Sequence, residues 1–350
     1  MKFLSNRLNL GLALMLFCIL LSACGPSPEE QVATAAALTA AAASQTPDPT
    51  VEQLPEPTDT QETSITSDLP GINYGNMEFD GKKRFYMVFV PEGYSDTEPF
   101  PLVIYLHSYG WGAQEGMDYT RLNELGDTFG FMIVYPSARP NWNSGIGDNP
   151  SWGTPDNNDV GFIDAMLDKL NEDYNIDEKR IYATGYSNGG FMAYMLACQL
   201  SHRIAAVASV SGVLSTSTLT GCDPSHSMPV VQIHGTDDGW VAIDGATGWH
   251  SVEETLNFWV QENNCEDMDF TVLEDINTSD DSTVEKISYT NCTDNSNIIY
   301  YKVINGGHTW PGADLPGYSA GNTNLDFDAS FAIWDVFKEY QLPQIVFDDK

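Results

Sequence analysis

Short, continuous apolar runs recur along the chain after about residue 69. A continuous run, as opposed to an alternation of apolar and polar residues, is typical of a strand that is buried on both faces of a sheet. The segments that we predict as strands are 84–90, 102–106, 131–135, 181–185, 205–210, 230–233 and 298–304.

Between these runs, apolar residues recur at helical spacing. The clearest case follows Asp159, which we place at a helix N-cap, and further helices are expected over 189–200, 252–261 and 329–340. Strands that alternate with helices predict an α/β fold with a mostly parallel central sheet flanked by helices on both faces. An architecture of this kind does not by itself define a function.

The first 68 residues have a different pattern. Lys2 and Arg7 precede an apolar run over 8–21 that is short for a membrane span. The run ends in Leu-Ser-Ala-Cys, which resembles the bacterial lipobox. We therefore predict a signal peptide over residues 1–23 and a lipidated Cys24 that tethers the protein to the outside of a cell membrane. The alternative is an ordinary signal peptide cut at the same place, with Cys24 incidental and the protein secreted.

Residues 24–68 are rich in Ala, Thr, Pro and Glu and contain no Phe, Tyr or Trp. Such a segment buries too little surface to order itself, so we expect a disordered linker. Residues 69–350 then form a single α/β domain, which would be extracellular.

The net charge of the chain limits the classes of molecule that it is expected to bind. The 350 residues carry a formal net charge of −34, with a pI near 4.1. Such a surface repels nucleic acid and anionic lipid, so we expect no nucleic-acid partner and no membrane contact beyond the anchor at Cys24. Neutral substrates suit this surface better than acidic ones.

Four cysteines follow Cys24 in the chain. An even number in an exported protein indicates two disulfides, for which three pairings are possible. Proximity in the sequence favours Cys198–Cys222 and Cys265–Cys292. No C-x-x-C pair and no H-x-x-x-H spacing suggests a zinc site, so we predict no metal.

One sequence motif indicates a catalytic residue. Residues 185–189 read Gly-Tyr-Ser-Asn-Gly, a G-x-S-x-G placed between an apolar strand and a helix. That context predicts a tight turn that presents Ser187 at the carboxyl edge of the sheet, and the turn needs small residues on both sides of the serine. The N-terminus of the following helix can then stabilise a developing oxyanion.

A nucleophilic serine needs a base, and the base needs an acid that orients it. In this arrangement the chain order is Ser, acid, His. His308 lies late in the chain in a glycine-rich loop after a predicted strand and is the best base. Asp237 and Asp238 follow another predicted strand, and chemistry alone does not choose between them.

An oxyanion hole needs two N–H donors. We expect the backbone N–H groups of Asn188 and Tyr109, because residues 107–110 follow a predicted strand at the place where such a loop is usually found. His107 is interpreted as a structural brace for that loop, and His234 as a brace for a turn.

These segments together resemble the secreted esterases grouped with polyhydroxybutyrate depolymerases and bacterial feruloyl or acetylxylan esterases. The resemblance covers about residues 71–343. It depends on the segments 106–107, 158–162, 180–194, 234–241 and, most specifically, on Gly-Gly-His-Thr-Trp-Pro-Gly at 306–312. It implies an α/β-hydrolase fold, serine esterase activity without a cofactor, and Asp238 as the triad acid through an H-G-T-x-D pattern. The family also carries cysteines that match the four above.

Two segments depart from the pattern of that family. Ser108, in the loop expected to form the oxyanion hole, stands where many members have glycine. Residues 239–242 replace a proline-containing segment of the pocket wall. Five tryptophans lie near the site in sequence, and the two nearest to triad candidates, Trp240 and Trp310, are the expected pocket walls. The others are Trp111, Trp142 and Trp152.

The expected function is therefore hydrolysis of a small or oligomeric carboxylic ester through an acyl-enzyme on Ser187. The sequence does not choose among feruloyl, acetyl and hydroxyalkanoate esters. Two alternatives remain open: a serine peptidase of the same fold, although the accessory domain of prolyl-oligopeptidase types is absent, and a non-catalytic surface binding protein, although no triad member is lost.

Overall fold

A computed structural model describes residues 70–146, 157–313 and 320–343. The predicted signal peptide, Cys24 and the linker lie outside the described residues, as does Trp152. Within the described part of the chain, no helix combines the length and the apolar character that crossing a membrane requires.

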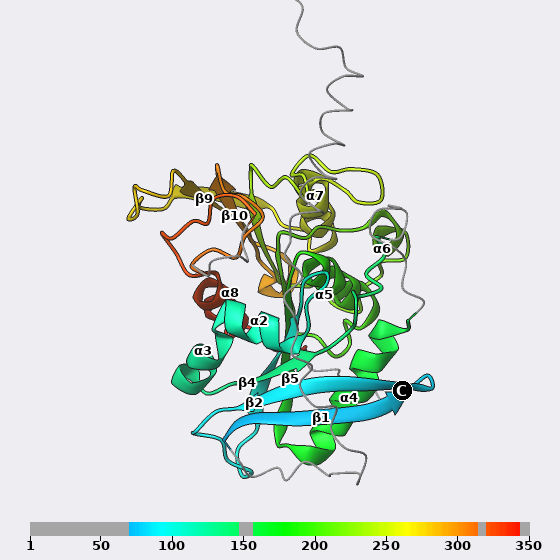
Figure 1. The fold of residues 1–350 in the computed structure, drawn as a ribbon. Coiled ribbons are helices and arrows are strands. Elements are labelled where there is room, and N and C mark those ends of the chain that lie inside the picture. Colours follow the sequence, from blue (N-terminus) through cyan, green and yellow to red (C-terminus); the bar gives the residue numbers. More distant parts are fainter. Residues whose placement is uncertain (1–69, 147–156, 314–319, 344–350) are drawn as a thin grey trace, which may run out of the picture. The chain divides into compact units, whose positions relative to one another are not determined.

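The described strands form one ten-stranded sheet with the order β1-β2-β4-β3-β5-β6-β7-β10-β9-β8 (Figure 1). Strands β4, β3, β5, β6, β7 and β10 run parallel, and antiparallel strands flank them on both sides. The strands are β1 (Gly71–Phe79), β2 (Lys82–Val90), β3 (Phe100–Leu106), β4 (Met132–Pro136), β5 (Ile176–Tyr186), β6 (Ala206–Val210), β7 (Val230–Gly235), β8 (Asp267–Val272), β9 (Thr283–Thr290) and β10 (Ile298–Ile304).

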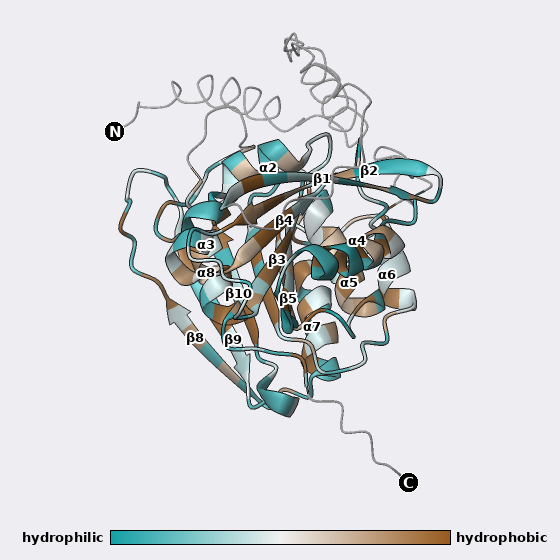
Figure 2. Cartoon of the chain, turned by 90° about the horizontal axis from the view of Figure 1, so that it is seen from below, coloured by the Kyte–Doolittle hydropathy of each residue, from teal (hydrophilic) through white to brown (hydrophobic). Residues whose placement is uncertain are grey.

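Helices cover both faces of this sheet, and the central strands between them are strongly hydrophobic (Figure 2). Helices α4 (Asp159–Asp173), α5 (Asn188–Gln199) and α7 (Val252–Glu262) pack on one face. Helices α2 (Ala113–Thr120), α3 (Leu122–Phe129) and α8 (Ala329–Phe337) pack on the other. Short α6 (Thr216–Thr220) and the 3-10 turn η1 (Thr293–Asn295) are the remaining elements of the described residues. The predicted α/β class, with a mostly parallel sheet between helices, is confirmed.

All seven predicted strands are present, but β1, β8 and β9 were not predicted. Their burial explains why, because all six residues of β8 are exposed and β1 is mostly exposed or half-buried. Such strands carry no continuous apolar run. Their place in the sheet comes from pairing with neighbours, which the hydrophobic pattern does not encode.

The predicted N-cap of α4 was wrong by one residue. The side chain of Asn158, not Asp159, accepts the hydrogen bond from the Gly161 N–H at 3.0 Å. Asp159 instead is the first helical residue and forms a buried ion pair with Arg84, at 2.6 Å. A partner 75 residues away decided its role.

Two disulfides join the four described cysteines, Cys198–Cys222 and Cys265–Cys292. These are the pairs that proximity in the sequence favoured. The first connects the end of α5 to the residues after α6, and the second joins the segment after α7 to the segment after β9.

Candidate active site

Ser187 lies on a strained turn between β5 and α5. Its backbone has φ 55° and ψ −117°, a conformation that a residue with a side chain rarely adopts. A Cβ at Gly185 would overlap the carbonyl of Gly189, and a Cβ at Gly189 would overlap the carbonyl of Leu106. The two glycines of the motif are thus required by space, as the sequence predicted, and strain of this kind is often found at functional sites.

The turn places Ser187 at the N-terminus of α5. The Ser187 N–H donates to Val210 of β6 at 2.8 Å, and the Ser187 carbonyl accepts from Gly190 and Phe191 at the start of the helix. Asn188 is the first residue of α5, so its backbone N–H has no acceptor within the helix. That donor, with the positive end of the helix dipole, suits an anion that forms beside the serine.

Asp238 is buried in the loop after β7 and accepts three hydrogen bonds. Its Oδ1 accepts from the N–H groups of Trp240 and Val241 at 2.9 and 2.8 Å, and its Oδ2 accepts from His308 Nδ1 at 2.7 Å. Burial alone would raise the pKa of Asp238. The hydrogen bond and charge of His308, aided by His234 and the Val241 N–H, outweigh burial and hold this pKa below its ordinary value. Asp237, its neighbour, is exposed.

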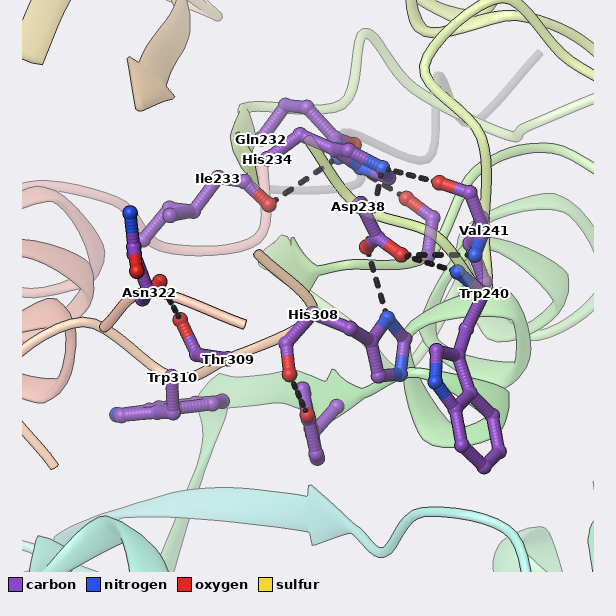
Figure 3. A network of polar contacts seen from close by, with 12 residues as sticks. Gln232, Ile233, His234, Asp238, Trp240, Val241, His308, Thr309, Trp310 and Asn322 are labelled. Atoms are coloured by element: carbon purple, nitrogen blue, oxygen red, sulfur yellow. Dashed lines mark hydrogen bonds and ion pairs between the residues drawn. The ribbon is translucent and has the colours of Figure 1, made fainter. Parts of the chain in front are cut away.

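His308 lies in the loop after β10, where β10 neighbours β7 in the sheet. Because its Nδ1 bonds Asp238, its Nε2 is the nitrogen left for proton transfer (Figure 3). The Tyr186 hydroxyl donates to the His308 carbonyl at 2.7 Å, which ties the histidine loop to the residue before Ser187. In the described part of the chain, no hydrogen bond joins the Ser187 hydroxyl to His308. In enzymes without substrate this bond is often long and tightens when substrate binds.

His107 and His234 have their ring nitrogens engaged by backbone and amide groups. His107 Nε2 accepts from the Ala138 N–H at 3.0 Å, and its Nδ1 lies 2.8 Å from the Ser108 carbonyl. Burial is the main cause that lowers the pKa of His107 to about 4, so this ring is neutral near pH 7. His234 Nε2 lies 2.8 Å from the Val241 carbonyl, and burial also lowers its pKa. Both contacts fit bracing roles.

Ser108, which departs from the resembled family, is buried and is not among the described residues with positive φ. A side chain therefore fits there without backbone strain. Tyr109 follows Ser108 in the loop after β3, and 41% of the surface of Tyr109 is exposed.

The tryptophans divide into exposed and buried ones. Trp240 is 58% exposed and its ring stacks on His308, with centroids 6.0 Å apart and planes 16° apart. The prediction that Trp310 lines the pocket was wrong. Its side chain is 1% exposed, packs against Tyr105 and donates from Nε1 to Ser330, and it points away from His308 (Figure 3). The place of Trp310 in the sequence, two residues after His308, does not determine which way its side chain points.

Two features of the site have no signal in the sequence. The Asn188 side chain does not point to solvent but bonds the backbone of Trp142, and Trp142 is fully buried. The two bonded residues are 46 apart in the chain, so local spacing could not reveal this contact. Within the described residues, no group of His, Cys, Asp and Glu side chains is arranged to hold a metal ion.

A strained serine between a parallel strand and a helix, in a mostly parallel sheet covered by helices on both faces, defines the α/β-hydrolase class. Residues 94–282 match the phospholipase/carboxylesterase family, and the chain belongs to that family. It is therefore a carboxylic ester hydrolase, and the predicted esterase family is confirmed.

Two curated relatives illustrate the similarity. Feruloyl esterase D of Neurospora crassa is 26% identical over 241 residues, which are 68% of this chain and 78% of the relative. A probable feruloyl esterase C of Aspergillus terreus is 29% identical over 205 residues, 57% of this chain and 68% of the relative. Among solved structures, the acetyl xylan esterase from Aspergillus awamori matches with a TM-score of 0.50 at 15% identity, covering 68% of this chain and 94% of that one. At this identity the match shows the fold alone.

Proposed function

We propose that this chain is an extracellular serine esterase with Ser187 as nucleophile, His308 as base and Asp238 as the acid that orients it. The observation that carries the proposal is the buried 2.7 Å bond from His308 Nδ1 to Asp238, in a loop that Tyr186 ties to the strained turn of Ser187. The carboxylate holds the ring in the tautomer whose Nε2 can accept a proton.

The chemistry needs only these side chains and two backbone donors. His308 Nε2 takes the Ser187 proton while the serine oxygen bonds the ester carbon, and the oxyanion is stabilised by the N–H groups of Asn188 and Tyr109. The proton then passes from His308 to the departing alcohol, which leaves an acyl-enzyme. Water then attacks the acyl carbon and gives a proton to His308, the bond from that carbon to the serine oxygen breaks, and His308 returns the proton to Ser187 as the acid leaves. Asp238 stabilises the imidazolium in both halves.

For the substrate, we propose feruloyl or acetyl esters of plant polysaccharide, with hydroxyalkanoate oligomers as the third class. The names of the relatives, feruloyl esterase among them, support the first class. Trp240 also supports it, because an exposed indole beside His308 offers a flat face on which an aromatic acyl group can stack.

For the location, we propose export by residues 1–23, a lipid anchor at Cys24, a linker over 24–68 and an esterase domain over 69–350. Two disulfides support an oxidising compartment outside the cell. The wild type should incorporate a radiolabelled fatty acid and a Cys24→Ser chain should not, and a wild type without the label would contradict the anchor.

The test of the activity is hydrolysis of short-chain p-nitrophenyl esters by the purified full chain, wild type beside Ser187→Ala. Loss of the nucleophile should lower kcat by roughly 10⁴- to 10⁶-fold while circular dichroism stays unchanged. Methyl ferulate, acetylated xylan and hydroxybutyrate oligomers then rank the three substrate classes. A folded wild type no more active than Ser187→Ala on every ester would overturn the proposal.

A further inference from the structure

The segment 137–146 between β4 and α4, here termed the bridging loop, contacts the loop after β3 at three points. The Ala138 N–H donates to His107 Nε2 at 3.0 Å, and the Pro140 carbonyl accepts from the Gly110 N–H at 2.8 Å. The Trp142 indole Nε1 donates to the His107 carbonyl at 3.0 Å. The bridging loop thus holds the residues on both sides of Tyr109.

The same loop also holds the other proposed oxyanion donor, through Trp142 again. The Trp142 N–H donates to Asn188 Oδ1 at 2.8 Å, and Asn188 Nδ2 donates to Ser144 Oγ at 2.9 Å and to the Trp142 carbonyl at 3.4 Å. Trp142 therefore bonds Asn188 with its backbone and His107 with its side chain. Among the described residues, these contacts connect the loop that contains Tyr109 to Asn188, the two residues whose N–H groups form the proposed oxyanion hole.

The far side of the bridging loop is anchored to a rigid support. The Asn143 N–H donates to Asp159 Oδ2 at 2.8 Å, and Asp159 Oδ1 pairs with buried Arg84 at 2.6 Å. The Arg84 guanidinium lies 3.9 Å from the centre of the Phe162 ring. An ion pair buried in this way holds its partners in one geometry, so Asn143 fixes the position of its neighbour Trp142.

Among the described residues, the indole of Trp142 differs from three other buried indoles, although Trp310 also uses its Nε1, on Ser330. Trp249, Trp259 and Trp334 are buried, and their Nε1 atoms have no hydrogen-bond partner in the part of the chain that the structure describes. Those side chains fill space. The indole of Trp142 also fills space against His107, with ring centroids 5.0 Å apart, but its N–H is used on a backbone carbonyl beside the site.

We propose that Trp142 is a positioning residue that sets the distance between the two oxyanion donors, the N–H groups of Tyr109 and Asn188. This inference rests on the proposed function, because it assigns a role toward the oxyanion of that reaction. Oxyanion donors act only when they are held at hydrogen-bond distance from the place where charge develops. The end of β3 and the start of α5 are closely packed, since a Cβ at Gly189 would overlap the Leu106 carbonyl at the end of β3. Removing the indole N–H lets that strand end shift relative to the serine turn.

The test compares Trp142→Phe with Trp259→Phe in the full chain. Both variants replace a buried indole by a smaller ring, but only the first removes a hydrogen bond. Active sites are counted with a fluorophosphonate, so kcat is expressed per reactive serine and a loss of folded protein does not count. We expect Trp142→Phe to lower kcat about 10- to 100-fold, somewhat less than the loss of a whole oxyanion donor, with KM within about two-fold. Trp259→Phe should keep the wild-type kcat.

A transition-state mimic separates positioning from general damage. The oxygen of a trifluoromethyl ketone adduct occupies the oxyanion hole, so its inhibition constant should rise in Trp142→Phe by the same factor by which kcat/KM falls. Asn188→Ala removes the side-chain bonds to the bridging loop but keeps the backbone N–H, and it should lower kcat/KM and raise the inhibition constant in the same way. This variant provides the test if Trp142→Phe does not fold. Because both variants loosen one spacing, the double variant should lose little more than the worse single one.

Three results are distinguishable. Equal kcat per site in the Trp142 and Trp259 variants, or a rise in KM alone, would overturn the positioning role while leaving the esterase proposal intact. Additive losses in the double variant would also overturn it, because they would mean that the two residues act separately. A wild type that neither reacts with the fluorophosphonate at Ser187 nor hydrolyses esters would instead overturn the proposed function, and the inference with it.

Discussion

Asp237 and Asp238 are neighbours in the chain with opposite surroundings. Asp237 is exposed and accepts a hydrogen bond from Thr236, whereas Asp238 is 4% exposed and meets His308. Successive residues of a loop after a strand point in different directions, so only one of two adjacent carboxylates can face the histidine. The structure places Asp238 there, the residue that the resemblance indicated.

This pair allows a controlled substitution. Asp238→Asn keeps an oxygen for the N–H groups of Trp240 and Val241 but no longer fixes the tautomer of His308 or stabilises its charge. We expect kcat to fall by about 10³- to 10⁴-fold. Asp237→Asn changes the same charge on the same loop and should leave kcat within about two-fold. Steady-state kinetics of both variants provides the test, and equal losses would remove Asp238 from its proposed role.

At the scale of elements, α5 is the helix on which the site is built. Its residues from Asn188 to Cys198 are all buried, and it packs between the sheet and its neighbouring helices. Ser187 is at one end of this helix and the Cys198–Cys222 disulfide is near the other. We therefore expect this disulfide to stabilise the helix that supports the site, from the end of the helix opposite Ser187.

Replacing both Cys198 and Cys222 by alanine should lower the free energy of unfolding by about 2–4 kcal/mol. The reason is that a cross-link over 24 residues restricts the unfolded chain. Urea unfolding of the double variant beside wild type measures the change, and kcat of the folded variant should stay near that of wild type. Unfolding curves that coincide would show that this disulfide does not contribute to stability.

For the whole molecule, two effects of pH oppose each other. A net charge of −34 causes self-repulsion at neutral pH, and acidification toward the pI near 4.1 relieves it. His107 acts in the opposite direction. Its pKa is about 4 in the folded protein, below the ordinary value of 6.5, so below pH 6.5 the unfolded chain binds a proton that the folded protein does not.

His107 should therefore cost stability as pH falls from about 6.5 to about 4, by about 3 kcal/mol over that interval. The measurement is the free energy of unfolding against pH for wild type and His107→Gln. The variant retains the surface charges, so the difference between the curves isolates the histidine. We expect the wild type to lose more stability than the variant on acidification. Parallel curves would mean that His107 does not titrate differently in the two states.

The sequence by itself determined the features that depend on local pattern. Continuous apolar runs located the central strands, because a strand covered on both faces must be apolar throughout. Glycines on both sides of Ser187 located the serine turn, because a side chain there would collide with neighbouring backbone. The order of serine, aspartate and histidine along the chain, each in a loop after a predicted strand, together with the family resemblance, located the candidate triad.

Only the tertiary structure decided which partner each side chain meets. It turned Trp310 into the core and Trp240 to the surface, although each lies two residues from a proposed triad member. It paired Asp159 with Arg84, joined Asn188 to Trp142, and placed the fully exposed β8 at the edge of the sheet. The physical reason is common to these cases. Periodicity reports whether a residue is buried, whereas the identity of the group that buries or bonds it depends on chain segments that are distant in sequence and meet only when the sheet is assembled.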